Sequence, residues 1–305
     1  MSEITKLHDD EVDIDAALVA RLLAAQFPQW ADRPIRPVAS SGTDNVTFRL
    51  GADLAVRLPR TPATAGEVEQ DLLWLPRLAP HLPLAIPEPV AAGKPGEGYP
   101  FSWGVYRWLD GEPFRLDRLT DPCRAAADLA EFVRSLRALD ATGAPTPSDD
   151  PFSRGIPLAP RDTMFRAALD ELRDEFDTDL VLAAWEASLA AAPWDGVPVW
   201  IHGDLMSGNL LVTEGRLSAV IVFGTLRAAD PAGDLLAAWY VFAGESRRVF
   251  RAEVGVDDDT WARGRGWALS LALIAIPHYR RRNPGMVSRA PHVVAATLAD
   301  FAAER

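Results

Sequence analysis

The chain has little of what disulfide-bonded or membrane-bound proteins need. Cys123 is its single cysteine, which excludes an intramolecular disulfide framework and fits a reducing cytoplasm. No uninterrupted apolar run approaches the ~20 residues that span a membrane. The charged N-terminal stretch, "MSEITKLHDDEVDIDAALVARLL", lacks the apolar centre of a signal peptide. We therefore expect a cytoplasmic protein without a membrane partner.

Basic charge and metal-ligand patterns are also scarce. Lysine and arginine number 31 against 43 acidic residues, so the net charge is -12. A nucleic-acid binder needs a basic face for the phosphates, so we expect no nucleic-acid partner. The five histidines lack the spacing of zinc ligands. With 48% hydrophobic and 24% charged residues over 305 positions, the composition predicts a packed core large enough for two lobes.

The predicted elements are strands with one helix, followed mainly by helices. Residues 14–27 have the periodicity of an amphipathic helix, and "NVTFRLG" and "LAVRLP" are typical of two strands joined by the hairpin turn "GAD". We expect a helix at 63–78, a proline-rich extended or edge segment at 81–93 and a strand at 99–109. The remaining pattern predicts helices at 121–139, 161–191, 232–243, 257–283 and 289–304, with short strands at 199–202, 209–212 and 217–223. This order favours an α+β fold.

Seven stretches carry a family resemblance, in one order, over roughly residues 35–243. They are "SSGTDNVTFRLG", "AVRLPR", "VEQDLLWLPRLAPHLP", "YPFSWGVYRWLDGE", "WIHGDLMSGNLLV", "AVIVFG" and "ADPAGDLLAAW". Together they resemble the aminoglycoside phosphotransferase family, which shares the protein-kinase-like fold. The resemblance implies a bilobal α+β fold, with a β-rich, nucleotide-binding N-lobe at 1–108 and a helical C-lobe at 109–305 that contains the catalytic loop and acceptor pocket.

The stretch "HGDLMSGN" is the most specific of the seven. Phosphoryl transfer needs an oriented acceptor hydroxyl and neutralised phosphate charge. By resemblance, Asp204 is the catalytic aspartate that orients or accepts the hydroxyl proton, Asn209 binds Mg²⁺, and His202 holds the loop. The alternative is a polar turn in which these side chains cap backbone groups. Met206 and Ser207 depart from the family pattern of histidine or tryptophan followed by proline.

The nucleotide would lie against the first lobe. Ser41 and Gly42, in a polar turn between strands, correspond to a loop whose backbone approaches the phosphates, although an ordinary hairpin turn has the same sequence features. Arg57 takes the place of a phosphate-binding lysine, and its helix partner is Asp71 by spacing, with Glu69 as the second choice. The alternative for these charged groups is a solvated strand or helix face.

Backbone groups around Arg107, Trp108 and Leu109 would bind the purine, which leaves ATP and GTP equally open as co-substrates. The implied reaction moves the γ-phosphate to a hydroxyl of a small molecule, such as an aminoglycoside, a macrolide or a related metabolite. The acidic stretch 170–179 could attract a cationic acceptor or form a solvated helix face. Trp185, Trp261, Trp267 and Tyr279 could line an apolar pocket or fill the core.

Val222 stands where the family has the aspartate that is its main Mg²⁺ ligand. Mg²⁺ takes oxygen ligands, and valine has none, so the predicted metal site is weakened to Asn209 and phosphate oxygens. As a pattern, "LSAVIVFG" is typical of a fully buried strand, where an aspartate would be costly. Asp230 and Asp234 in "ADPAGDLL" are the acids that could substitute as metal ligands, but an aspartate followed by proline, as at Asp230, is typical of a helix cap. The alternative function is a pseudokinase-like nucleotide or small-molecule binding protein, or an enzyme repurposed for non-phosphoryl chemistry.

Overall fold

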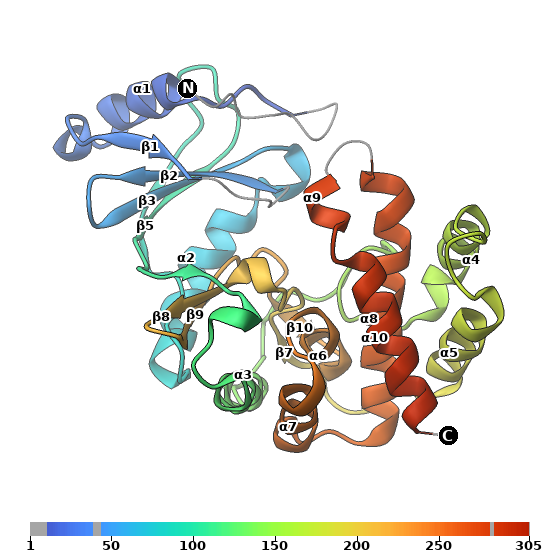
Figure 1. The fold of residues 1–305 in the computed structure, drawn as a ribbon. Coiled ribbons are helices and arrows are strands. Elements are labelled where there is room, and N and C mark those ends of the chain that lie inside the picture. The colour runs from blue at the N-terminus through green and yellow to red at the C-terminus, as the bar shows by residue number, and fades with distance from the viewer. Residues whose placement is uncertain (1–10, 39–43, 281–283, 305) are drawn as a thin grey trace. The chain divides into compact units, whose positions relative to one another are not determined.

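The computed structural model describes residues 11–38, 44–280 and 284–304, which form two compact units (Figure 1). The first unit comprises the described part of Met1–Glu112 and also Ala219–Gly224. The second comprises Pro113–Ser218 and the described part of Thr225–Arg305. Within the described residues, no helix is both long enough and apolar enough to cross a membrane.

The first unit is built on an antiparallel sheet of five strands. Its spatial order is β1 (Ile35–Pro37), β2 (Asn45–Leu50), β3 (Leu54–Pro59), β5 (Trp103–Arg107) and β4 (Pro89–Gly93). Helix α1 (Ala16–Gln26) buries its apolar side in the same core as β2, β3 and β5. The predicted β2–β3 hairpin is confirmed, and the proline-rich segment supplies the edge strand β4. Helix α2 (Glu67–Leu78) begins four residues later than predicted, after a 3-10 turn at Pro62–Thr64.

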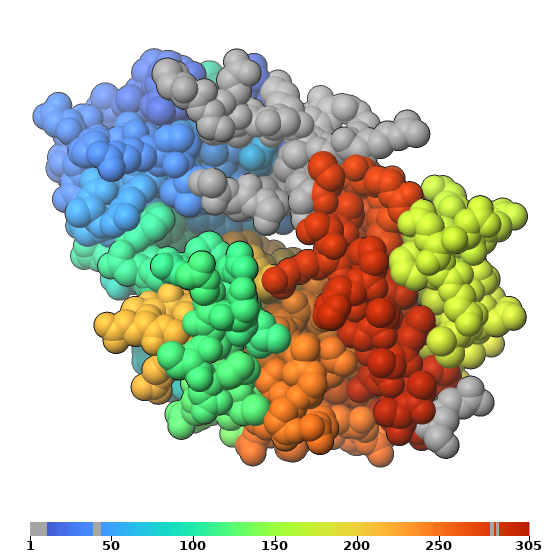
Figure 2. Space-filling view, viewed as in Figure 1, coloured from blue at the N-terminus to red at the C-terminus, as the bar shows by residue number. Residues whose placement is uncertain are grey.

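The second unit is mainly helical. Its helices are α3 (Pro122–Arg137), α4 (Asp162–Glu171), α5 (Thr178–Ala190), α6 (Ala237–Tyr240), α7 (Gly244–Val254), α8 (Asp258–Tyr279), α9 (Pro284–Val287) and α10 (Ala290–Ala303). Helix α8 packs against α4, α5 and α10, while α3 packs against α7. In Figure 2 the α4–α5 pair forms a ridge beside α8 and α10.

Short strands connect the helices of this unit. Strands β7 (Val199–Ile201) and β10 (Arg227–Ala229) form an antiparallel pair. Strands β8 (Leu210–Thr213) and β9 (Arg216–Val220) form a hairpin joined by β6 (Glu112–Pro113). Figure 1 shows α8 and α10 between the α4–α5 pair and the β7–β10 pair. The sheet-based first unit and helical second unit agree with the predicted α+β class.

Two of the predicted helices differ from those observed. The stretch 161–191 contains two helices rather than one, and 232–243 contains a 3-10 turn at Pro231–Asp234 followed by the short α6. Helix α7 was not predicted at all. Its buried side chains, Ser246, Phe250 and Val254, are four residues apart, as on one face of a helix, but only two of them are apolar. The helix packs against α3.

The prediction of a buried strand through Val222 is wrong. Strand β9 ends at Val220, and Val222 is partly exposed with a φ of 64°. A positive φ places the residue in the left-handed region, where a β-branched side chain is an outlier and aspartate or asparagine is better tolerated. The backbone at position 222 is therefore less suited to valine than to aspartate or asparagine.

Candidate functional site

The transfer loop, defined here as His202–Asn209, follows β7 in the second unit. Nδ2 of Asn209 donates to Oδ2 of Asp204 at 2.6 Å and to the Asp204 carbonyl at 2.8 Å. The amide thus fixes both the carboxylate and the backbone of the aspartate. Because Nδ2 is the donor, Oδ1 of Asn209 is the oxygen that remains to bind a metal. The two residues that the sequence predicts as catalytic and metal-binding are brought together.

Buried groups hold the start of this loop. Nδ1 of the fully buried His202 accepts the Asp204 amide at 3.2 Å. The carboxylate of Asp234, which is 1% exposed, accepts the amides of His202 at 3.0 Å and Gly203 at 2.6 Å. The hydroxyl of Thr225 donates to the His202 carbonyl at 2.6 Å. Burial raises the pKa of Asp234 to about 6, although both amides favour the carboxylate.

Arg154 lies against the same loop and was not predicted from the sequence. Its Nε donates to the Gly203 carbonyl at 3.0 Å, and its Nη2 is 3.4 Å from Oδ1 of Asp204. Gly203 has a φ of 79°, and a Cβ there would lie 3.0 Å from Cβ of Arg154. Glycine therefore permits both the turn and the close approach of the arginine. Arg154 comes from an irregular segment, where periodicity gives no signal.

The first unit contains a second charged cluster, between β3 and α2. Nη1 of Arg57 is 3.2 Å from Oδ2 of Asp71, which also accepts the Tyr106 hydroxyl at 2.8 Å. Glu67 lies 3.7 Å from Arg57 and accepts Nδ2 of Asn45 at 2.8 Å. Burial raises the pKa of Asp71 and raises that of Glu67 to about 7, while Arg57 acts in the opposite direction on both. The cluster is a buried ion pair supported by two neutral donors.

Spacing correctly selects Asp71 rather than Glu69 as the partner of Arg57. Asp71 is 2% exposed, whereas Glu69, two residues earlier on α2, is exposed. Glu67 was missed as a member of the cluster, because it lies one helical turn before Asp71 and has no distinguishing sequence context.

A sequence profile of the phosphotransferase enzyme family matches residues 35–267. The chain belongs to this family. The match covers the Arg57–Asp71 pair, the transfer loop and the first part of α8. No curated protein sequence matches significantly.

Solved structures show the same fold. The GDP complex of aminoglycoside 2'-phosphotransferase-IIIa is 20% identical, with a TM-score of 0.73 over 94% of this chain and 100% of that one. The ADP-bound aminoglycoside phosphotransferase APH(2'')-Ib is 19% identical, with a TM-score of 0.61 over 93% and 98%. Macrolide 2'-phosphotransferase MphH from Brachybacterium faecium is 22% identical, with a TM-score of 0.57 over 92% and 98%. The kinase-like fold predicted from the resemblance is confirmed.

The other predicted nucleotide contacts are only partly described. Ser41 and Gly42 lie outside the described residues. The amide of Arg107 donates to the Glu88 carbonyl, and that of Trp108 donates to the Asp53 carbonyl, each at 2.9 Å. Within the described chain, Leu109 is thus the one of the three predicted purine contacts whose amide makes no hydrogen bond.

The resemblance assigns Mg²⁺ to Asn209 and to position 222. No group of three or more histidine, cysteine, aspartate or glutamate side chains is arranged to hold a metal among the described residues. The side chain of Val222 offers no oxygen, the Thr225 hydroxyl donates to the transfer loop, and Asp230 pairs with Arg263 at 2.8 Å while capping the turn that follows. The carboxylate that lies against Asn209 is that of Asp204, at 2.6 Å from its amide nitrogen.

Acidic residues of the stretch 170–179 form ion pairs and a helix cap at the α4–α5 connection. Asp170 pairs with Arg173 at 2.7 Å, Glu175 pairs with Arg280 at 2.9 Å, and Asp177 caps α5. These contacts favour the solvated-face alternative. Figure 1 also places the α4–α5 pair on the side of α8 away from β7, the strand that precedes the transfer loop.

The tryptophans fill the core rather than line a pocket. Trp185 stacks on Phe165, Trp261 packs against Trp239, and Trp267 contacts Arg161, each with no more than 1% exposure. Tyr279 is partly exposed at the end of α8. The pocket alternative is therefore wrong for the three tryptophans.

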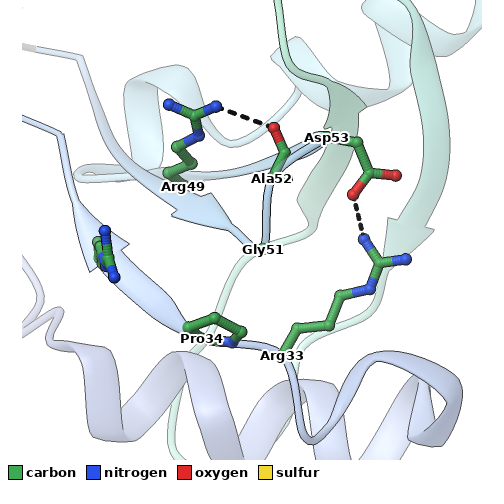
Figure 3. Close-up of a pocket in the computed structure, with 7 residues that line it drawn as sticks. Arg33, Pro34, Arg49, Gly51, Ala52 and Asp53 are labelled. Atoms are coloured by element: carbon green, nitrogen blue, oxygen red, sulfur yellow. Dashed lines mark hydrogen bonds and ion pairs between the residues drawn. The ribbon is translucent and has the colours of Figure 1, made fainter.

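The first unit also has a shallow surface hollow at the β2–β3 turn (Figure 3). Figure 3 shows Arg33 paired with Asp53 and Arg49 donating to the Ala52 carbonyl. None of the predicted site residues lines this hollow, so it is not the predicted nucleotide site.

Proposed function

We propose that the protein transfers the γ-phosphate of ATP or GTP to a hydroxyl of a small-molecule acceptor, with transfer limited by Val222. The observation that carries this proposal is the fixed carboxylate of Asp204. It is bonded by Asn209, and its loop is bound at consecutive amides by the buried Asp234. A buried carboxylate that binds loop amides is costly, and it is consistent with a loop whose position matters.

Each proposed role follows from a group's chemistry. Asp204 would orient the acceptor hydroxyl and accept its proton, because its carboxylate is partly exposed and held in place. Arg57 would contact the nucleotide phosphates, with Asp71 and Tyr106 fixing its side chain. Leu109 would contact the purine through its backbone. Mg²⁺, when bound, supplies positive charge to the phosphates, and Asn209 is the family ligand that this chain retains.

Nucleotide binding is the direct test. A ligand that binds only the folded state raises its stability by RT ln(1 + [L]/Kd). Melting curves should therefore rise with dose for ATP or GTP, and Arg57→Met should reduce the rise. Arg173→Met is the matched control, because it removes an exposed arginine that pairs only with its neighbour on the surface. The absence of a rise with either nucleotide at millimolar concentration would refute the proposal.

The second candidate is a pseudokinase-like binding protein, and Val222 favours it. A chain without the metal-binding carboxylate could bind a nucleotide or a small molecule without efficient transfer, or use the site for non-phosphoryl chemistry. Single-turnover assays with radiolabelled ATP and GTP, over aminoglycoside and macrolide acceptors, separate the two. Product that requires Asp204 indicates an enzyme, whereas binding without product indicates a binding protein.

A further inference from the structure

Two arginines of the second unit lie near the start of the transfer loop. Arg154 contacts Gly203 and Asp204 as described, and Arg227 pairs in register with Ile201, the residue before the loop. Nη1 of Arg227 donates to the hydroxyl of Ser153 at 2.5 Å, next to Arg154. Burial lowers the pKa of Arg227, and the charge of Arg154 lowers it further. The two guanidinium groups thus lie close enough to repel one another.

A third arginine is buried behind them without a carboxylate partner. Arg161 is 0% exposed; its Nε donates to Ser270 at 3.0 Å, its Nη1 donates to the Pro151 carbonyl, and its guanidinium lies 4.8 Å from the Trp267 ring. Its Nη2 is buried and has no hydrogen-bond partner in the described chain. Burial lowers the pKa of Arg161 to about 10, and Arg154 contributes. Burying this charged group without a carboxylate partner is costly, and negative charge nearby would offset the cost.

Few acids balance these charges. Arg161 is influenced by Asp150, which is exposed and caps the Phe152 amide, and Arg154 by Asp204. Asp234 also lies at the loop, where its carboxylate accepts two amides and is influenced by Arg137. Among the described residues, four guanidinium groups therefore stand against three carboxylates here, in a chain whose net charge is -12. A local excess of positive charge in an acidic protein attracts anions and repels polycations.

We propose that the acceptor is an anionic small molecule, whose carboxylate or phosphate group binds Arg154 and Arg227 beside the transfer loop, with the buried Arg161 adding to the positive charge of the site. This rests on the proposed transfer reaction and names its substrate class. Planar guanidinium groups bind both kinds of anion through paired hydrogen bonds. The geometry gives the anion a second effect. By taking over Nη2 of Arg154, it releases Oδ1 of Asp204 to accept a hydrogen bond from the acceptor hydroxyl.

Four matched sugars test the charge preference on the full-length protein without nucleotide. Glucuronate and glucose 6-phosphate carry the two anionic groups, glucose is neutral and glucosamine is cationic. At equal ionic strength, the melting temperature should rise with dose for at least one anionic sugar and not for glucose or glucosamine. The two anionic arms distinguish a carboxylate from a phosphate. Kanamycin serves as the polycationic probe.

Variants assign the effect to the arginines. Arg154→Met should weaken binding of the anionic sugar roughly tenfold or more, and Arg154→Lys should keep part of it. Arg227→Gln is a second variant in case Arg154→Met folds poorly. Arg166→Met, an exposed arginine on α4 paired with Asp162, is the matched control and should change nothing. Arg57→Met should also leave the effect intact, which excludes binding of the sugar at the nucleotide phosphates.

The proposal is overturned if no anionic sugar stabilises the protein, if glucosamine or kanamycin stabilises it as much, or if Arg154→Met and Arg227→Gln both bind like the parent. These results are separate from the fate of the transfer reaction. Nucleotide binding without anion preference would reject only the anionic acceptor, and anion binding without nucleotide binding would reject only the transfer reaction.

Discussion

Replacing Val222 separates two properties of that position, its left-handed backbone and its lack of an oxygen ligand. The left-handed conformation costs a non-glycine residue roughly 1–2 kcal/mol, and asparagine tolerates it better than valine. The partly exposed valine would lose about 1 kcal/mol of apolar burial on replacement. Because these effects oppose one another, Val222→Asn should change the free energy of unfolding by about 1 kcal/mol or less in either direction.

Val220 supplies the matched control two residues earlier. It is 0% exposed in β9, and its amide donates to the Ala85 carbonyl at 2.9 Å. Val220→Asn removes a packed side chain and buries an amide group, so it should cost roughly 3 kcal/mol or more. Urea unfolding of the two variants measures the contrast. Equal losses for Val220→Asn and Val222→Asn would refute the left-handed, partly exposed position of Val222.

A carboxylate at position 222 then tests the metal. Val222→Asp and Val222→Asn share the backbone tolerance and each add a side-chain oxygen, but only aspartate adds charge. Val222→Asp should therefore gain more Mg²⁺-dependent stabilisation by nucleotide than Val222→Asn. The measurement is a melting series in ATP or GTP, with and without Mg²⁺, for the parent and both variants. If aspartate and asparagine respond equally to Mg²⁺, a carboxylate at position 222 does not contribute to metal binding.

Three further predictions concern the transfer loop and the Arg57 cluster. Asp204→Asn should reduce any phosphoryl transfer by ~10²–10⁴-fold with nucleotide affinity nearly unchanged, and parent-level turnover would make Asp204 a turn residue. Asp234→Asn places an NH₂ group against a loop amide, so it should lower both turnover and the free energy of unfolding. The loss in urea unfolding should be roughly 2 kcal/mol. Unchanged turnover would mean that the position of the loop does not limit the reaction. The pKa of Glu67 is about 7 when folded against 4.5 as a reference, so its stabilising contribution is complete below about pH 4.5 and is lost as pH rises through about 7. In Glu67→Gln, the midpoint of urea unfolding should therefore fall less as pH rises than it does in the parent. An unchanged pH profile would contradict the raised pKa of Glu67.

Features with local causes could be predicted from the sequence. The β2–β3 hairpin follows from alternating strands around "GAD". Asp71 follows from the resemblance, because its spacing to Trp74 on α2 aligns it with the family's helix acid. The link between Asp204 and Asn209 likewise lies within five residues of chain. Such contacts depend on short-range geometry, which residue order specifies well.

Features that depend on distant residues could not be predicted. Arg154 reaches Asp204 across fifty positions from a segment without periodicity, and Asp234 binds the loop from thirty-one positions away at Gly203. The turn at Val222 could not be predicted from the sequence for another reason. Its apolar neighbours have the composition of a strand, while the chain leaves the extended conformation after Val220.

The turn at Val222 is fixed by its neighbours rather than by residue 222 itself. Val220 is bonded to Ala85, and the carboxylate of Glu67 occupies the space that a Cβ at Gly224 would take. The left-handed backbone between them therefore persists although valine opposes it. An aspartate would enter a conformation that already suits it, with no rebuilding of the segment. If Val222→Asp gains transfer that depends on Asp204, the parent lacks one ligand of an otherwise intact site. If it gains Mg²⁺ binding but no transfer, the loss extends beyond that ligand and the binding-protein alternative is favoured.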